Sequence, residues 1–117
     1  MANAIPNALK ELAAALNAAS TTLRRSTGGL PDDWAVHGKN GHIYPDGNGF
    51  WVYAATGESK IKWNHLKTAF LPYCRLAQDG DDEGAFHLAG LPDKEFAIVI
   101  RKWLGIRKRQ PPPINSF

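Results

Sequence analysis

The chain has little cysteine and no long apolar run. Cys74 is the one cysteine among 117 residues, which excludes an internal disulfide framework and is typical of a reducing cytoplasm. No stretch is apolar for long enough to span a bilayer, and residues 1–16 lack the basic start and continuous apolar core of a signal peptide. We therefore expect a cytoplasmic protein with no membrane partner.

The local motifs of common enzymes are also missing. The sequence contains no G-x-S-x-G nucleophile turn, no glycine-rich phosphate loop and no internal repeat. The histidines and Cys74 show no paired spacing of the kind that zinc ligands have. We expect no catalytic residue, no cofactor and no metal site.

Acidic residues are scarce at both ends of the chain. The net charge is +3, but residues 26–100 contain more acidic than basic residues. Residues 101–117 have no acidic residue and contain the basic residues Arg101, Lys102, Arg107, Lys108 and Arg109. A basic cluster that follows an acidic middle is a weak indication of a polyanionic partner.

Leucines recur at helical spacing near the N-terminus. Pro6 suits a first helical turn, and the residues from Ser26 to Gly29 would end a helix. The spacing predicts one helix over residues 6–25, which we expect to pack on its own domain. The alternative is a homodimer contact along the same face, formed by Leu9, Leu12, Leu16 and Leu23.

The remaining chain alternates between strand and helix patterns. Strands are expected over residues 34–37, 42–44 and 50–56, with glycine- and asparagine-rich turns between them. Helices are expected over residues 60–71 and 93–104, with Ser59 and Asp93 as N-caps and Gly105 at the end of the second. Between these helices, residues 73–90 read as a hairpin with an Asp- and Gly-rich tip.

The predicted fold class is therefore α+β. Its order is an N-terminal helix, a β-hairpin or meander, a helix, a β-hairpin and a helix, with an antiparallel sheet and helices on one face. We expect a single domain over residues 1–109 and a flexible proline-rich tail over residues 110–117.

Three stretches of the sequence resemble stretches of known proteins. They are GHIYPDGNGFWVYAATGES (41–59), QDGDDEG (78–84) and LGIRKR (104–109). The chain is similar in these strings to an uncharacterised group of short proteins from alphaproteobacterial and phage-like genomes. The resemblance covers about residues 41–109 and implies a mobile-element setting without implying an activity.

Two basic surfaces make nucleic-acid binding the favoured function. The helix over residues 60–71 would present Lys60, Lys62 and Lys67 away from its aromatic face. The second surface comprises Arg101, Lys102, Arg107, Lys108 and Arg109. Basic side chains on a helix can neutralise the phosphates of DNA or RNA. The prediction is a small non-enzymatic nucleic-acid-binding protein of mobile-element type.

The acidic hairpin tip supports a second hypothesis. Its carboxylates, Asp79, Asp81, Asp82 and Glu83, could contact a basic protein that handles nucleic acid. The chain would then be a phage-like inhibitor, for example an anti-defence protein of anti-CRISPR type. A metal site at this tip is disfavoured because neither it nor Asp46-Gly47-Asn48 has the loop that calcium sites use.

A Mg²⁺-dependent nuclease is the remote alternative. Asp46, Glu58 and Lys60 match the loose form of a PD…ExK arrangement, in which two carboxylates hold Mg²⁺. Glu58 and Lys60 fall at the end of a strand and the start of a helix, whereas this chemistry needs them on a strand.

Overall fold

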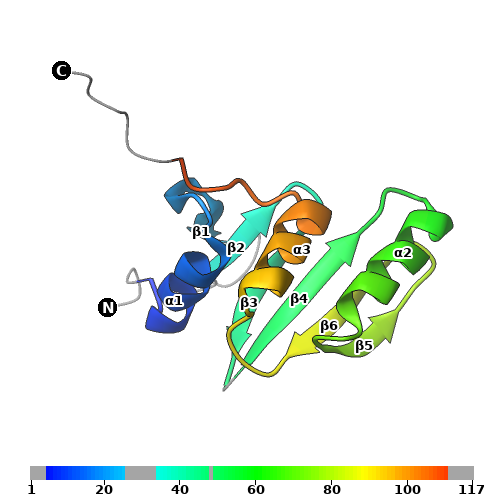
Figure 1. Cartoon of the computed structure of the whole chain (residues 1–117), viewed down its shortest axis with the longest axis horizontal. Helices are drawn as coiled ribbons and strands as arrows, with labels where there is room; N and C mark the ends of the chain where they lie inside the picture. Colours follow the sequence, from blue (N-terminus) through cyan, green and yellow to red (C-terminus); the bar gives the residue numbers. More distant parts are fainter. Residues whose placement is uncertain (1–4, 26–33, 48, 111–117) are drawn as a thin grey trace.

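The computed structural model describes residues 5–25, 34–47 and 49–110. Within them, three α-helices and six strands form an α+β fold, which confirms the predicted class (Figure 1). In chain order the elements are α1 (Asn7–Leu16), a 3₁₀ turn η1 (Ser20–Thr22), β1 (Leu23–Arg25), β2 (Trp34–Gly38), β3 (Gly41–Asp46), β4 (Gly49–Ala55), α2 (Lys60–Phe70), β5 (Arg75–Asp79), β6 (Glu83–Leu88) and α3 (Lys94–Leu104). None of the helices in the described residues is long and apolar enough to cross a membrane.

The strands form one open antiparallel sheet in the order β1-β2-β3-β4-β6-β5. Strands β1 to β4 are sequential neighbours, and Lys39 and Asn40 make the tight turn between β2 and β3. Helix α2 carries the chain from β4 to the edge strand β5, and β6 then returns between them. The hairpin expected over residues 73–90 therefore forms the end of the sheet.

One face of the sheet carries the core. Alternate residues of the strands, such as Val36, Ile43 and Val52, are fully buried because all three helices cover this side (Figure 1). The largest buried side chains of the helices are Trp63 and Phe70 on α2 and Phe96 on α3. The expected placement of the helices on one face is thus confirmed.

The N-terminal helix is shorter than the sequence predicts. It ends at Leu16 because Asn17 adopts a left-handed conformation with φ of 53°. The N–H groups of Asn17 and Ala18 bond back to carbonyls of the last turn, the pattern that closes a helix. The predicted helix over residues 6–25 is wrong beyond this point, and Leu23 instead pairs with Val36 in the sheet.

The leucines proposed for a homodimer contact lie inside the domain. Leu9, Leu12 and Leu16 have no exposed surface, and Leu23 is partly buried against the same core. The alternative of a dimer through these side chains is therefore wrong, and packing of the helix on its own domain is correct.

Capping residues set the bounds of the other two helices. The Ser59 side chain accepts a hydrogen bond from the Lys62 N–H, and Asp93 accepts one from the Phe96 N–H. Gly105 ends α3 in the left-handed conformation. These ends confirm the helices predicted over residues 60–71 and 93–104 to within one residue.

The chain after α3 runs along the N-terminal segment. Ala18 and Lys108 form an isolated antiparallel bridge, and the Arg109 N–H donates to the Asn17 carbonyl over 2.7 Å. Residues 106–110, which we call the C-terminal strap, are therefore fixed to the domain. The flexible tail predicted for residues 110–117 lies, from residue 111 on, outside the described residues.

Candidate functional site

The face of the sheet opposite the helices carries a group of ring side chains. They occupy the strand positions that alternate with the core residues, because successive side chains of a strand point to opposite faces. All are partly exposed, and they are His37 on β2, His42 and Tyr44 on β3, Trp51 and Tyr53 on β4, and His87 on β6.

Four of these rings form a row across three strands, which we call the ring row: His37, His42, Tyr44 and Tyr53. The His42 ring lies 5.2 Å from the Tyr53 ring at an interplanar angle of 22°, and Tyr44 lies 6.0 Å from Tyr53 at 15°. His37 extends the row from β2, 5.9 Å from His42. His42, Tyr44 and Tyr53 are stacked on one another, and the His37 ring is tilted by 33° to that of His42. Together these rings offer aromatic surface on which another planar group can stack.

Trp51 and His87 continue the aromatic surface toward β6. Their rings meet edge to face at 5.0 Å, and the His87 Nε2 lies 3.2 Å from an Asp46 carboxylate oxygen. Arg75 on the edge strand β5 is in register with His87, so the same face ends in a cation.

The two histidines of the row favour their neutral form. Burial, and then the charge of Arg24, lowers the pKa of His37 below its ordinary value of 6.5. Burial, and then the electrostatic effect of His37, lowers the pKa of His42 as well. At neutral pH both imidazoles therefore contribute ring surface to the row without adding charge.

Two hollows lie beside the ring row. The larger has a volume of about 780 Å³, within the range of ligand sites, and is lined by His42, Tyr53 and residues of the β5–β6 hairpin such as Gln78 and Glu83. The smaller, of about 350 Å³, is lined by His37 and by the basic residues Arg24 and Arg107, among others. Lys39, in the β2–β3 turn, lines both.

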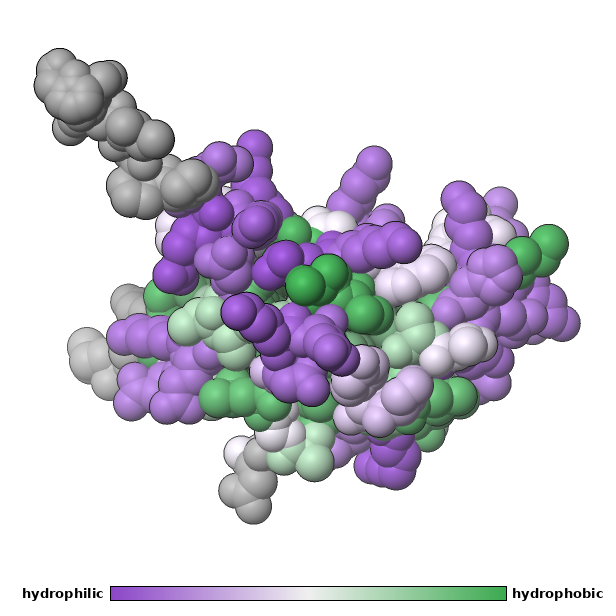
Figure 2. Space-filling view, viewed as in Figure 1, coloured by the Kyte–Doolittle hydropathy of each residue, from purple (hydrophilic) through white to green (hydrophobic). Residues whose placement is uncertain are grey.

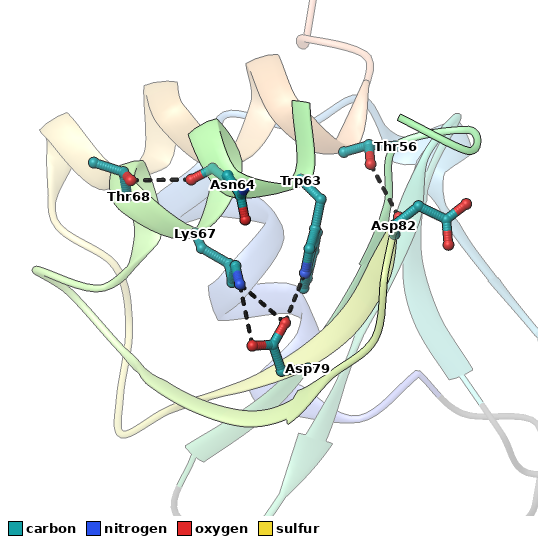
Figure 3. A network of polar contacts seen from close by, with 7 residues as sticks. All are labelled: Thr56, Trp63, Asn64, Lys67, Thr68, Asp79 and Asp82. Atoms are coloured by element: carbon teal, nitrogen blue, oxygen red, sulfur yellow. Dashed lines mark hydrogen bonds and ion pairs between the residues drawn. The ribbon is translucent and has the colours of Figure 1, made fainter. Parts of the chain in front are cut away.

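The lysines predicted on α2 do not act as one free surface. Lys60 and Lys62 are exposed. The Lys67 amine, in contrast, lies 3.1 Å from both oxygens of Asp79 and above the Trp63 ring (Figure 3). Lys67 is thus engaged in holding the hairpin against α2.

The predicted C-terminal basic residues have different roles. The Arg101 guanidinium donates to the Leu16 carbonyl over 2.7 Å, which satisfies the end of α1. Lys102 lies over the Trp103 ring. Arg107, Lys108 and Arg109 are exposed on the C-terminal strap, at the other end of the sheet from α2 (Figure 1).

Two of the four acidic residues at the hairpin tip, Asp79 and Asp82, make hydrogen bonds that stabilise the fold. Asp79 accepts hydrogen bonds from the Trp63 Nε1 at 2.8 Å and from Lys67, and these two donors, in that order, lower its pKa. The Asp82 carboxylate accepts from the Glu58 N–H at 2.7 Å, and its carbonyl accepts from Thr56 (Figure 3). Asp81 and Glu83 remain exposed for the partner contact that the sequence predicts for all four.

The residues of the nuclease alternative are not brought together. Asp46 ends β3 opposite the start of β4, whereas Glu58 and Lys60 follow the end of β4. A strand of seven residues separates the two sets by about 20 Å, too far for one Mg²⁺ to contact both.

Within the described ranges, no group of three or more His, Cys, Asp or Glu side chains could hold a metal ion. Burial raises the pKa of Cys74 to about 12, so its thiol stays protonated, and its Sγ donates weakly to the Phe70 carbonyl.

The ring row was not predicted from the sequence. The sequence does contain a signal for it, because ring side chains occupy every second position: His42 and Tyr44 in one strand, and Trp51 and Tyr53 in the next. The aromatic residues of Phe50 to Tyr53 indicated a strand, but only the pairing of the strands shows that their rings gather on the uncovered face.

Comparison of the chain with family models, curated proteins and solved structures gave no match.

Proposed function

We propose that this chain is a non-enzymatic nucleic-acid-binding protein and that it binds single strands on the ring-bearing face of its sheet. The observation that carries the proposal is the ring row, with rings 5.2–6.1 Å apart on a face that the helices leave uncovered. Unpaired bases stack on such rings, and each stacked base contributes about 1–3 kcal/mol to binding.

Charge supports this choice of ligand. Arg24 and Lys39 flank one end of the ring row and Arg75 lies at the opposite edge of the sheet. The backbone of a single strand would meet these cations while its bases lie on the rings. Glu83 and Asp46 also lie on this side, but Asp46 is engaged by His87.

The proposed surface differs from the two basic surfaces that the sequence predicts. Of the predicted C-terminal basic residues, Arg107 borders it, because Arg107 lines the smaller hollow together with His37 and Arg24. Lys60 and Lys62 lie on the helix side, which is rich in hydrophilic residues (Figure 2). Duplex DNA or RNA offers no exposed base faces, so the ring row would favour single strands over duplexes.

Fluorescence anisotropy with a labelled single strand of about twelve nucleotides, and with the duplex of the same sequence, tests this function. We expect the single strand to bind more tightly and its affinity to fall as salt rises from about 50 to about 200 mM. Absence of binding at the lowest salt, or duplex binding as tight as single-strand binding, would refute the proposal.

A further inference from the structure

The smaller hollow, which we call the cationic hollow, is lined by three basic residues from three separate segments. Arg24 comes from β1, Lys39 from the β2–β3 turn and Arg107 from the C-terminal strap. Of the described residues that line it, none is acidic, and the others are His37, Thr21, Thr22, Gly38 and Gly105. Its volume of about 350 Å³ lies near the lower end of the range for small-ligand sites.

Backbone hydrogen bonds hold these segments in place. The Lys39 N–H donates to the Gly105 carbonyl over 3.1 Å, and the Asn40 N–H donates to the Leu104 carbonyl over 2.8 Å. The Ala19 N–H donates to the Arg107 carbonyl over 2.9 Å. The turn and the end of α3 are so close that a Cβ at Gly38 would overlap the Leu104 carbonyl oxygen. The frame that carries the cations is therefore fixed before any ligand arrives.

The cationic hollow is contiguous with the ring row. His37 lines the hollow and is also the first ring of the row, and its Nε2 lies 3.2 Å from the Arg24 carbonyl oxygen. The charge of Arg24 reaches this ring, since it contributes to the lowered pKa of His37 after burial. A ligand that occupied both places would combine an anionic group with a planar one.

We infer that the cationic hollow binds a phosphate group of the single strand whose bases stack on the ring row. This inference rests on the proposed function, which it deepens by naming the group that fixes the position of the strand. Two guanidinium groups can each donate two parallel hydrogen bonds to phosphate oxygens, and a lysine adds a compact charge. Phosphate also relieves the mutual repulsion of three cations around a hollow of this size.

Charge removal at the hollow provides the test, with a control that removes the same charge elsewhere. The hollow variant combines Arg24→Gln, Lys39→Gln and Arg107→Gln, which are all exposed residues. The control variant combines Lys60→Gln, Lys62→Gln and Lys94→Gln, which are exposed on α2 and at the start of α3. Circular dichroism and thermal unfolding show whether both remain folded.

We expect the hollow variant to bind a labelled single-stranded oligonucleotide at least about tenfold more weakly than wild type at low salt. Its slope of log affinity against log salt should be shallower by about 0.7 for each phosphate that the variant no longer neutralises. The control variant should change both quantities much less. Equal reductions in both variants would mean that only net charge matters, which would overturn the phosphate site and leave the proposed function intact.

A titration with inorganic pyrophosphate, followed by NMR, distinguishes failure of the phosphate site from failure of the proposed function. Saturable shifts of the Lys39 and Gly105 amides support the phosphate site even if no oligonucleotide binds, in which case the proposed function alone is wrong. Without such shifts and without oligonucleotide binding, both the site and the function are refuted.

Discussion

At the scale of single residues, Tyr53 serves the fold and the proposed site through different parts of one residue. Its backbone belongs to β4 and its neighbours Val52 and Ala54 are buried under the helices. Its ring points the other way and lies against His42 and Tyr44. The ring can therefore be changed without a change in the core.

Replacing Tyr53 by leucine should weaken single-strand binding by about 1–3 kcal/mol, because one stacking platform is removed. The midpoint of thermal unfolding should move little, since leucine is tolerated on a half-exposed strand position. Fluorescence anisotropy measures the affinity, and His65→Ala, an exposed ring on α2, is the control. Unchanged affinity in the Tyr53 variant would argue against stacking on this row.

Asp79 is the residue through which pH should act on stability. Its pKa is lowered in the fold, so the unfolded chain binds a proton at higher pH than the folded chain does. The contribution of its charge is present above about pH 4 and is lost as pH falls below that value.

Asp79→Asn keeps an acceptor for Trp63 but removes the ion pair with Lys67. We expect the variant to unfold at a lower temperature than wild type at pH 7, with the difference vanishing near pH 2. Calorimetric unfolding as a function of pH measures this, and Asp81→Asn at the exposed hairpin tip is the matched control. A constant difference at every pH would contradict the assigned role of the charge.

At the scale of elements, local signals account for what the sequence predicts correctly. Ser59, Asp93 and Gly105 mark the ends of α2 and α3, and each occupies the capping position expected of it. The β2–β3 turn was also predicted, but its two residues are Lys39 and Asn40, and Gly41 is the first residue of β3. These features need no knowledge of distant contacts.

The N-terminal segment shows where local signals are insufficient. The leucine spacing continues to Leu23, so the pattern alone cannot reveal that Asn17 turns the chain. Pairing of Leu23 with Val36 outweighs helix propensity there, and it depends on a strand that is distant in sequence. The ring row was missed for a related reason: which face of a sheet stays uncovered is decided by where the helices pack.

Substitutions of Asn17 test whether its left-handed conformation is what ends α1. Asn17→Gly should leave the free energy of unfolding unchanged or slightly higher, because glycine adopts positive φ readily. Asn17→Val should lower it by about 1–2 kcal/mol, because a β-branched residue is strained in this conformation. Urea unfolding measures both, and equal effects of the two substitutions would show that the conformation of residue 17 is not what ends α1.

Leu12 tests the burial of α1. Leu12→Ala should lower the free energy of unfolding by about 2–5 kcal/mol, because it leaves a cavity in the core. Sedimentation analysis should give the same oligomeric state for variant and wild type. If the variant instead dissociated while its monomer stayed as stable as wild type, Leu12 would be part of a dimer contact after all.

At the scale of the whole molecule, the two sides of the sheet have separate tasks. The helices bury one side and form an outer surface rich in hydrophilic residues (Figure 2). The other side carries the ring row and the cationic hollow next to it. The acidic hairpin closes the sheet at the far end, where Asp79 and Asp82 fix it to α2 and the turn before it.

This division predicts where a single strand touches the protein. Amide signals of residues on β2, β3 and β4 should shift when an oligonucleotide is added, because the rings lie on these strands. Signals of the exposed part of α2, which carries Lys60 and Lys62, should remain in place.

NMR chemical-shift mapping with an unlabelled single-stranded oligonucleotide is therefore the most direct measurement. If single strands stack on the ring row, the shifts should be saturable, centred on His42, Tyr44 and Tyr53, and should extend to Lys39. Shifts centred on α2, with the ring row unaffected, would contradict this stacking.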